Sequence, residues 1–141
     1  MSLLNIQVTP IREIVTSGGN VLHGLKSNES SFQGFGEAYF SWVEVGAIKA
    51  WKRHNEMVMN LIVPFGNVHF AFYDSDTNNF FSIAVGENNY SRITVPSGIW
   101  FGFQGLKSPK SLVLNISNIP HDPSETDRLE ISKIHYDWVN L

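Results

Sequence analysis

The chain has 141 residues, is 43% hydrophobic and 13% aromatic, and carries a formal net charge of −3. These values suit one folded domain, residues 1–141, and argue against a disordered chain. Without a basic stripe the chain is no candidate for nucleic-acid binding, and no apolar run reaches the ~18 residues of a membrane-spanning helix.

The chain contains no cysteine, which excludes disulfides and thiolate chemistry. No charged segment followed by an apolar run opens the sequence, so we expect no signal peptide and no membrane partner. The expected location is the cytoplasm.

Short runs of apolar, β-branched and aromatic residues recur between turn signals, as is typical of strands. Pro64-Phe65-Gly66 separates two such runs and predicts a hairpin with glycine at a positive φ. The expected strands are Asn5–Ile11, Val21–Lys26, Phe35–Val43, Ala47–Arg53, Val58–Val63, Asn67–Tyr73, Phe80–Val85, Ser91–Val95, Ile99–Gly102 and Ser111–Ile116. The tail Leu129–Trp138 is either a final strand or a short helix, and the pattern favours a strand.

No segment sustains a helical period, so the pattern predicts an all-β sandwich or barrel, such as a jelly roll. Edge strands in such barrels are often covered by a second chain. We therefore expect a homodimer.

Two segments stand out chemically. GAIKAWKRH, at Gly46–His54, places four basic side chains in a strand otherwise built of Ala, Ile and Trp, and PSGIWFGF, at Pro96–Phe103, has a tight turn opening a buried strand. Cations beside indole rings on a sheet indicate the mouth of a barrel that binds an anionic, partly planar ligand.

Four segments together resemble the cupin family of dTDP-4-dehydrorhamnose 3,5-epimerase (RmlC-like), over roughly residues 32–138. The family has an R-G-L-H-Y-Q-like strand, a Gly turn with a strand ending in Asp, a P-x-G-x-x-H-G-F turn, and an aromatic segment running into Pro and Glu. The corresponding segments here are Lys49–His54, Gly66–Asp74, Pro96–Phe103 and Asn115–Glu125. The resemblance implies a cupin jelly roll and a nucleotide-sugar substrate.

The family's epimerases use a His assisted by an Asp as base, and a Tyr as acid, on a 4-keto sugar. By the resemblance, Lys52 takes the place of the His, Phe70 that of the Asp, and Phe101 that of the turn His. The Tyr falls near Pro120 or His121. The proton-transfer groups must therefore differ from the family's.

An epimerase needs a base with a pKa near neutrality and a group that stabilises negative charge on the substrate. His54 suits the base by its pKa, and Lys52 suits it if burial lowers its pKa. The two share one face of a regular strand, with Arg53 on the other. The alternative is that both merely end a solvated strand.

Most substrate contacts are expected along the strands Phe35–Val43 and Ala47–Arg53. Lys49 stands where the family has an arginine that contacts the diphosphate or sugar, and Glu37 where it has a Gln near the thymine. Tyr39 and Trp42 could stack on a base or sugar, or pack in the core or a dimer interface. The expected binding residues are Glu37, Tyr39, Lys49, Trp51, Arg53 and Glu125.

The polar group His121, Asp122 and Glu125 follows Pro120. His121 could replace the missing tyrosine as the acid. Alternatively the segment is a surface turn capped by Asp122.

Metal-binding cupins offer H-x-H, then Glu, then a later His, whereas here His54 and Glu56 form an incomplete set. We therefore expect no metal and no cofactor.

The expected function is a nucleotide-sugar epimerase or isomerase acting on a dTDP-linked 4-keto-6-deoxy sugar, with Lys52, His54 and His121 as candidate catalytic residues. The alternative is a non-catalytic cupin that binds a sugar nucleotide.

Overall fold

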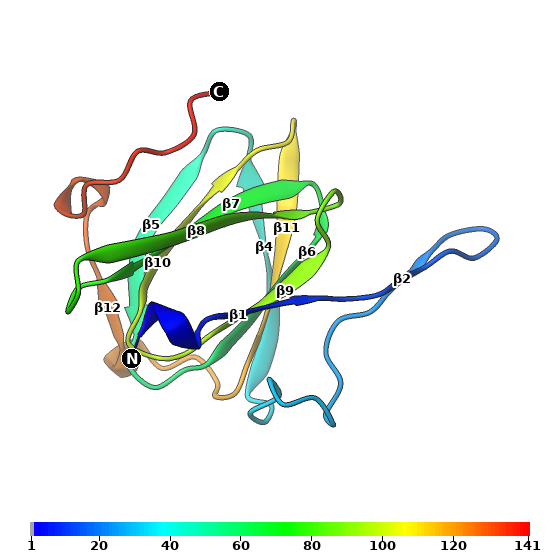
Figure 1. The fold of residues 1–141 in the computed structure, drawn as a ribbon, viewed down its shortest axis with the longest axis horizontal. Coiled ribbons are helices and arrows are strands. Elements are labelled where there is room, and N and C mark those ends of the chain that lie inside the picture. The colour runs from blue at the N-terminus through cyan, green and yellow to red at the C-terminus, as the bar shows by residue number, and fades with distance from the viewer. Residues whose placement is uncertain (1) are drawn as a thin grey trace.

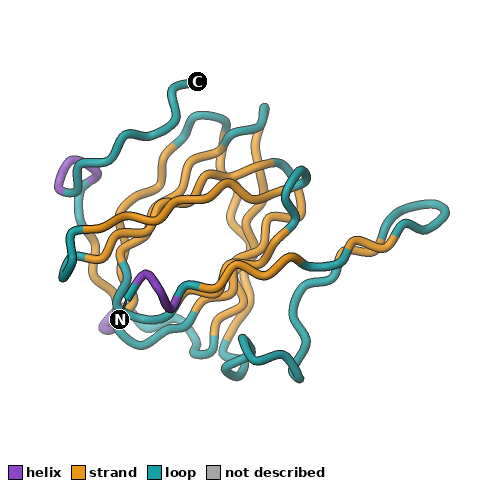
Figure 2. The backbone as a smooth tube through the Cα atoms, viewed as in Figure 1, coloured by secondary structure: helices purple, strands orange, loops and turns teal. Residues whose placement is uncertain are grey.

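The computed structural model describes residues 2–141 and contains two five-stranded antiparallel sheets that face each other (Figures 1 and 2). One sheet has the order β1-β9-β6-β11-β4 and the other β12-β5-β10-β7-β8. The strands are β1 (Gln7–Pro10), β2 (Glu13–Ile14), β3 (Val21–Leu22), β4 (Glu37–Glu44), β5 (Ile48–His54), β6 (Met59–Phe65), β7 (Asn67–Asp74), β8 (Asn79–Gly86), β9 (Ser91–Val95), β10 (Trp100–Gly105), β11 (Lys110–Ser117) and β12 (Thr126–Arg128). The all-β cupin jelly roll predicted from the sequence is confirmed.

The only helices in the described part of the chain are three short 3-10 turns: η1 (Leu3–Asn5), η2 (Pro123–Glu125) and η3 (Ile131–Lys133). None of the described helices has the length and apolar character that crossing a membrane requires.

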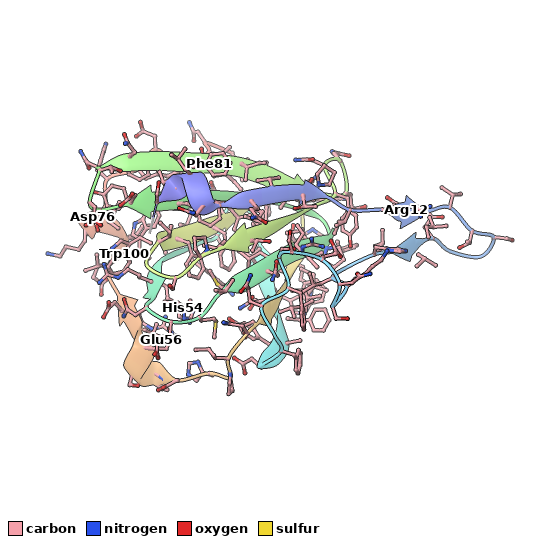
Figure 3. All side chains as sticks on the ribbon, turned by 60° about the horizontal axis from the view of Figure 1, so that its bottom comes forward. Arg12, His54, Glu56, Asp76, Phe81 and Trp100 are labelled. Atoms are coloured by element: carbon pink, nitrogen blue, oxygen red, sulfur yellow. The ribbon has the colours of Figure 1, made fainter. Side chains whose placement is uncertain are left out.

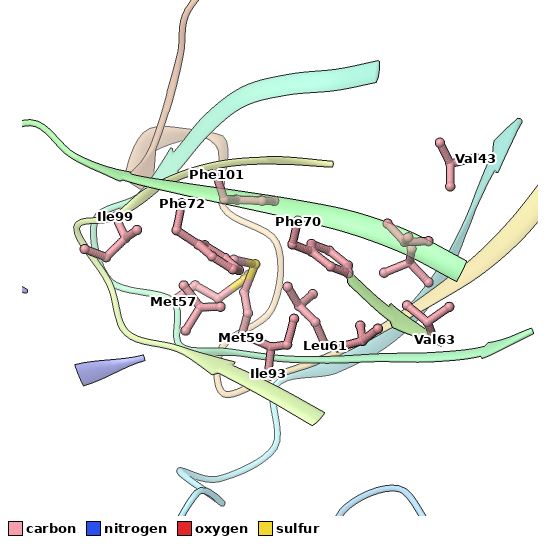
Figure 4. Packing of buried hydrophobic residues seen from close by; sticks show 14 residues of the cluster. Val43, Met57, Met59, Leu61, Val63, Phe70, Phe72, Ile93, Ile99 and Phe101 are labelled. Atoms are coloured by element: carbon pink, nitrogen blue, oxygen red, sulfur yellow. The ribbon is translucent and has the colours of Figure 1, made fainter. Parts of the chain in front are cut away.

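The hydrophobic core fills the space between the two sheets (Figure 4). Phe70 and Phe72 from β7 are fully buried and meet Leu61 and Ile93 from the opposite sheet. Because successive strand residues point to opposite faces, each strand contributes every second side chain to this core. Burying one such side chain contributes roughly 1.5–3 kcal/mol.

The predicted hairpin joins β6 and β7 through Gly66, which has a φ of +87°. A Cβ at Gly66 would collide with the Ser111 side chain, so both the backbone conformation and the space favour glycine. The turn signal in the sequence is therefore confirmed.

The predicted strand Val21–Lys26 is wrong beyond Leu22. Residues 23–31 form a loop held by Arg92, whose side chain is 1% exposed. The guanidinium donates to Gly24 O at 2.7 Å, to Glu29 Oε2 at 2.7 Å and to Ser31 Oγ at 2.8 Å. The backbone here is held by a side chain instead of a neighbouring strand.

The predicted final strand Leu129–Trp138 is also wrong, because the free edge of β5 pairs with Thr126–Arg128 instead. The tail contains η3 and then an irregular segment fastened by side chains. Gln104 bonds both the N–H and the C=O of Val139 at 2.9 Å, and Trp138 packs on Trp51 with ring centroids 5.3 Å apart. The alternating aromatics therefore pack on the outer face of a sheet without joining it.

Arg92→Ala should lower the free energy of unfolding by about 1.5–3 kcal/mol, because it removes the buried guanidinium and the hydrogen bonds that this group donates to charged and polar partners. Lys107→Ala is the matched control: it breaks an exposed ion pair with Glu87 and should change that free energy by about 0.5 kcal/mol or less. Urea unfolding of both variants measures this. Equal losses would show that Arg92 does not hold the loop.

Candidate active site

A cavity of about 830 Å³ opens between the two sheets. Its walls come from both sheets and from residues 128–133, which follow β5 along its edge. The lining residues are Tyr39, Ser41, Lys49, Ala50, Trp51, Lys52, Met59, Leu61, Phe101, Phe103, Val113, Asn115, Arg128, Leu129, Glu130 and Lys133.

An irregularity in β5 brings two lysines to this cavity. Lys52 lies opposite Phe101 and Lys49 opposite Phe103, although three positions separate the lysines. The β5–β10 register shifts at Trp51, which has no partner on β10, and such a bulge reverses the alternation of side chains. A regular strand would place Lys49 and Lys52 on opposite faces.

The cavity is rich in positive charge. Four lining residues are cationic, Lys49, Lys52, Arg128 and Lys133, whereas Glu130 is the one acidic residue among them. Burial lowers the pKa of Lys52, and the nearby charge of Arg128 lowers it further. Such a wall is suited to an anionic ligand.

A polar pair occupies the opposite wall. Asn115 Nδ2 donates to Tyr39 Oη at 3.2 Å. Because the phenol oxygen accepts this bond, its own proton is free to donate toward the cavity. Asn115 Oδ1 is buried and has no hydrogen-bond partner among the described residues.

His54 lies two residues beyond Lys52 at the end of β5, next to β12 (Figure 3). Its side chain is 3% exposed, and Nδ1 bonds the carboxylate of Glu125, which is 2% exposed. The ring stacks on Phe101 with centroids 6.0 Å apart. Nε2 is buried and has no hydrogen-bond partner in the described structure.

The backbone fixes Glu125 in turn. Its Oε2 accepts the N–H of Glu56 at 2.9 Å and that of Met57 at 3.2 Å. Burial raises the pKa of the Glu125 carboxyl, but the hydrogen bonds from His54 and from these two N–H groups outweigh it and bring the pKa to about 2. Glu125 therefore stays ionised.

Burial lowers the pKa of His54, although Glu125 opposes the change. The positive charges of Lys52 and His121 lower it further. His54 is therefore a neutral imidazole at pH 7. When Nδ1–H donates to Glu125, the lone pair of Nε2 remains available as a base.

The other residues predicted from the sequence lie in different surroundings. Arg53 points away from the cavity, bonds Asp127 at 2.7 Å and lies 4.7 Å from the Trp100 ring centre. Trp51 borders the cavity, but its indole packs in the outer aromatic cluster and donates to Ile131 O at 3.2 Å. His121 is exposed in the segment before η2.

Glu37 and Glu125 both lie close enough to Lys52 for their charges to raise its pKa against the effect of burial. Phe70 and Phe101, which the resemblance placed at family polar positions, lie in the apolar core. Within residues 2–141 no group of three or more His, Cys, Asp or Glu side chains could hold a metal ion.

Sequence reasoning missed Asn115, Arg128 and Lys133 as lining residues. Arg128 lies opposite Lys52 only because β12 pairs with β5, and the predicted tail strand hid that pairing. Asn115 had a signal, since it is a polar residue between apolar neighbours in a predicted strand.

The free energy of unfolding should fall as the pH drops below about 6.5, because unfolded His54 then binds a proton that the folded protein excludes. It should fall again from about pH 4.5 toward pH 2, because Glu125 takes up its proton at a higher pH in the unfolded protein than in the folded protein. In His54→Gln the loss between pH 7 and 5 should shrink. The control His135→Gln, at a side chain that is 94% exposed, should keep it, and identical urea-unfolding profiles for both variants would contradict a neutral buried His54.

No family model matches the chain. A probable low-salt glycan biosynthesis epimerase of Haloferax volcanii is 26% identical over 106 residues, which is 71% of this chain. The chain spans 66% of that relative's length.

Solved structures match more fully. A dTDP sugar isomerase from Desulfovibrio desulfuricans is 33% identical, with a TM-score of 0.90, over 95% of this chain and 90% of that one. A sugar 3,4-ketoisomerase from Thermoanaerobacterium thermosaccharolyticum, in complex with TDP, has a TM-score of 0.78 at 13% identity and covers 94% of both chains. The second likeness shows the fold alone, but the first also shows relationship: the chain belongs to the RmlC-like cupin family of sugar epimerases and isomerases.

Proposed function

We propose that the protein is a nucleotide-sugar epimerase or isomerase that acts on a dTDP-linked 4-keto-6-deoxy sugar in cell-envelope polysaccharide synthesis. The observation that carries the proposal is the buried His54, with Nδ1 bonded to the carboxylate of Glu125 and Nε2 unpartnered among the described residues. The 33% identity to a dTDP sugar isomerase supports the substrate class.

The cationic wall would bind the diphosphate. Lys49, Arg128 and Lys133 line the cavity, and Arg128 can offer a bidentate pair to phosphate oxygens. Tyr39 and Phe103 provide flat surfaces for the base or the sugar. These contacts orient the sugar with its keto group toward Lys52.

The chemistry begins at a carbon next to the C4 carbonyl. His54 Nε2 takes the proton from that carbon, and the electron pair of the C–H bond moves to the carbonyl oxygen to form an enolate. Lys52, as an ammonium, stabilises this oxygen. His54 is not itself a lining residue and its Nε2 is buried, so side chains beside the cavity must move for the sugar to reach this nitrogen.

Return of a proton to the opposite face would complete an epimerisation. His121 from the exposed segment before η2 is one candidate acid. Tyr39 is a second, because its phenol proton is free to donate into the cavity. Loss of turnover in His121→Asn or in Tyr39→Phe distinguishes the two.

We also propose that the protein works in the cytoplasm as a homodimer. A chain without cysteine needs no oxidising compartment to fold. An edge strand such as β4, which pairs on one side only, favours covering by a second chain.

Solvent deuterium exchange tests the reaction. When the wild-type protein is incubated with dTDP-4-keto-6-deoxyglucose in D₂O, the sugar should incorporate deuterium at C3 or C5. NMR of the sugar follows the incorporation. His54→Asn should slow the exchange about 10²–10⁴-fold, the effect of removing a general base.

His135→Asn is the matched control, because that imidazole is 94% exposed and should exchange at the wild-type rate. Binding without exchange in the wild type would favour the alternative, a non-catalytic sugar-nucleotide-binding cupin. Unchanged exchange in His54→Asn would reject His54 as the base, and Lys52→Ala would then be the next variant.

The affinity for dTDP should distinguish the role of Arg128 on β12 from that of Arg53 on β5. Arg128→Ala should weaken the affinity about tenfold or more, because it removes a cation from the cavity. Arg53→Ala removes the same charge outside the barrel and should leave the affinity nearly unchanged. Isothermal titration with dTDP gives both values. The reverse order would restore Arg53 as the binding residue expected from the sequence.

A further inference from the structure

One buried polar atom in the wall of the cavity has no hydrogen-bond partner within the described residues. The side-chain oxygen of Asn115, Oδ1, makes no hydrogen bond, although Asn115 is 2% exposed and lines the cavity. A buried carbonyl oxygen without a hydrogen bond costs free energy, and native proteins keep few such atoms. An unpaired acceptor in the wall of a binding cavity therefore points to a ligand that supplies the donor.

The other buried side-chain amides of the described chain are fully bonded. Asn60, which is 3% exposed, donates from Nδ2 to Ser31 O at 3.1 Å and accepts at Oδ1 from Thr94 Oγ1 at 2.6 Å. Gln104 bonds the backbone of the C-terminal tail through both of its amide atoms at 2.9 Å. The chain itself holds each of these amides on both sides, whereas it holds Asn115 by the nitrogen only.

The pairing of β11 with its neighbours fixes how the Asn115 amide is oriented. Asn115 is directly opposite Tyr39 on β4 and Leu61 on β6, and all three residues line the cavity. Asn115 Nδ2 donates to Tyr39 Oη at 3.2 Å, which turns the nitrogen side of the amide toward β4. The oxygen and the nitrogen lie on opposite sides of a side-chain amide, so Oδ1 faces away from the phenol. Tyr39 thus sets which end of the amide remains unbonded.

Asn115 lies at the buried end of the cavity, near the proposed base. Its Nδ2 is 3.9 Å from Met57 Sδ, and the backbone N–H of Met57 bonds the Glu125 carboxylate. That carboxylate holds His54. The three cations proposed to bind the diphosphate are exposed side chains. A nucleotide sugar with its diphosphate on those cations would therefore bring its sugar, and not its base, toward Asn115.

The free protein covers Asn115 Oδ1, as it also covers His54 Nε2. The side chain of Met57 packs against the Asn115 amide and is itself 1% exposed in the core (Figure 4). A methionine side chain has three rotatable bonds and adapts its shape readily, so its thioether can move aside when a sugar enters. A hydroxyl group of the sugar then replaces an apolar contact at the amide.

We propose that Asn115 determines which sugar the site accepts, because its Oδ1 accepts a hydrogen bond from a ring hydroxyl of the substrate. This inference rests on the proposed function, since it concerns the sugar of that reaction. A 4-keto-6-deoxyhexose linked through C1 keeps hydroxyl groups only on C2 and C3, so the donor is one of these two. A site built to bond a hydroxyl rejects an analogue that lacks it, because the buried acceptor then stays unpaired.

Binding of unreactive analogues tests this assignment. dTDP-6-deoxyglucose has a hydroxyl in place of the ketone, so it binds without reacting. The wild type should bind it about tenfold or more tightly than one of its two analogues, the 2-deoxy or the 3-deoxy sugar. In Asn115→Leu, which keeps a similar size but has no acceptor, that preference should disappear. The affinity of this variant for dTDP alone should equal that of the wild type. Isothermal titration gives all these affinities.

The outcomes separate this inference from the proposed function. Equal affinity of the wild type for all three sugars overturns the inference, and so does a preference that persists in Asn115→Leu. A parallel loss of affinity for dTDP in that variant would place the amide at the thymine base, and this also overturns the inference. A wild type that binds no sugar nucleotide overturns the proposed function together with the inference.

A second measurement distinguishes a binding role from a structural one and needs no ligand. Asn115→Leu removes an unpaired acceptor, so the urea midpoint of unfolding should stay the same or rise. Tyr39 loses one donor in this variant, but it is 38% exposed and can bond water instead. Asn60→Leu is the matched control, because it removes an equally buried amide together with its two hydrogen bonds, and its midpoint should fall.

A fall of the midpoint in Asn115→Leu as large as that in Asn60→Leu would show that the Asn115 amide is structural, which overturns the inference. Circular dichroism verifies that each variant folds. Asn115→Ala replaces Asn115→Leu in the titrations if the leucine side chain prevents folding.

Discussion

The hydrogen bond between His54 and Glu125 is the interaction on which the proposed chemistry depends. Burial removes water from both groups, which would favour neutral forms of each. Two backbone N–H groups and the imidazole keep Glu125 ionised, and the same burial keeps His54 neutral. A neutral imidazole oriented by a carboxylate has one nitrogen committed to its partner and the other free to accept a proton.

The pair also joins two parts of the chain that are 71 residues apart. β12 lies on the edge of β5, so that Thr126 faces His54 and Arg128 faces Lys52. One short strand therefore positions the carboxylate behind the base and a cation beside the cavity. The site uses Glu125 of this segment where the resemblance assigned the assisting Asp position to Phe70, which is buried in the core.

The sequence predicted the sheets well because alternation and turn residues are local signals. Gly66 and its neighbours indicated a hairpin, and Lys52 and His54 were placed on one face by the period of a strand. The bulge at Trp51 was not predictable from alternation, and it moved Lys49 into the cavity. The tail was misassigned because Tyr136 and Trp138 alternate like strand residues while packing on the outside of a sheet. The His54–Glu125 contact depends on the pairing of β12 with β5, which no local signal reveals.

The protonation state of His54 tests the central claim most directly. Long-range ¹⁵N–¹H correlation NMR, with the signals assigned by comparison with His54→Gln, reports which ring nitrogen carries the proton at each pH. We expect a neutral ring at pH 7 with the proton on Nδ1, toward Glu125, and Nε2 unprotonated. A doubly protonated ring at pH 7, or a proton on Nε2 alone, would contradict the role of His54 as the base.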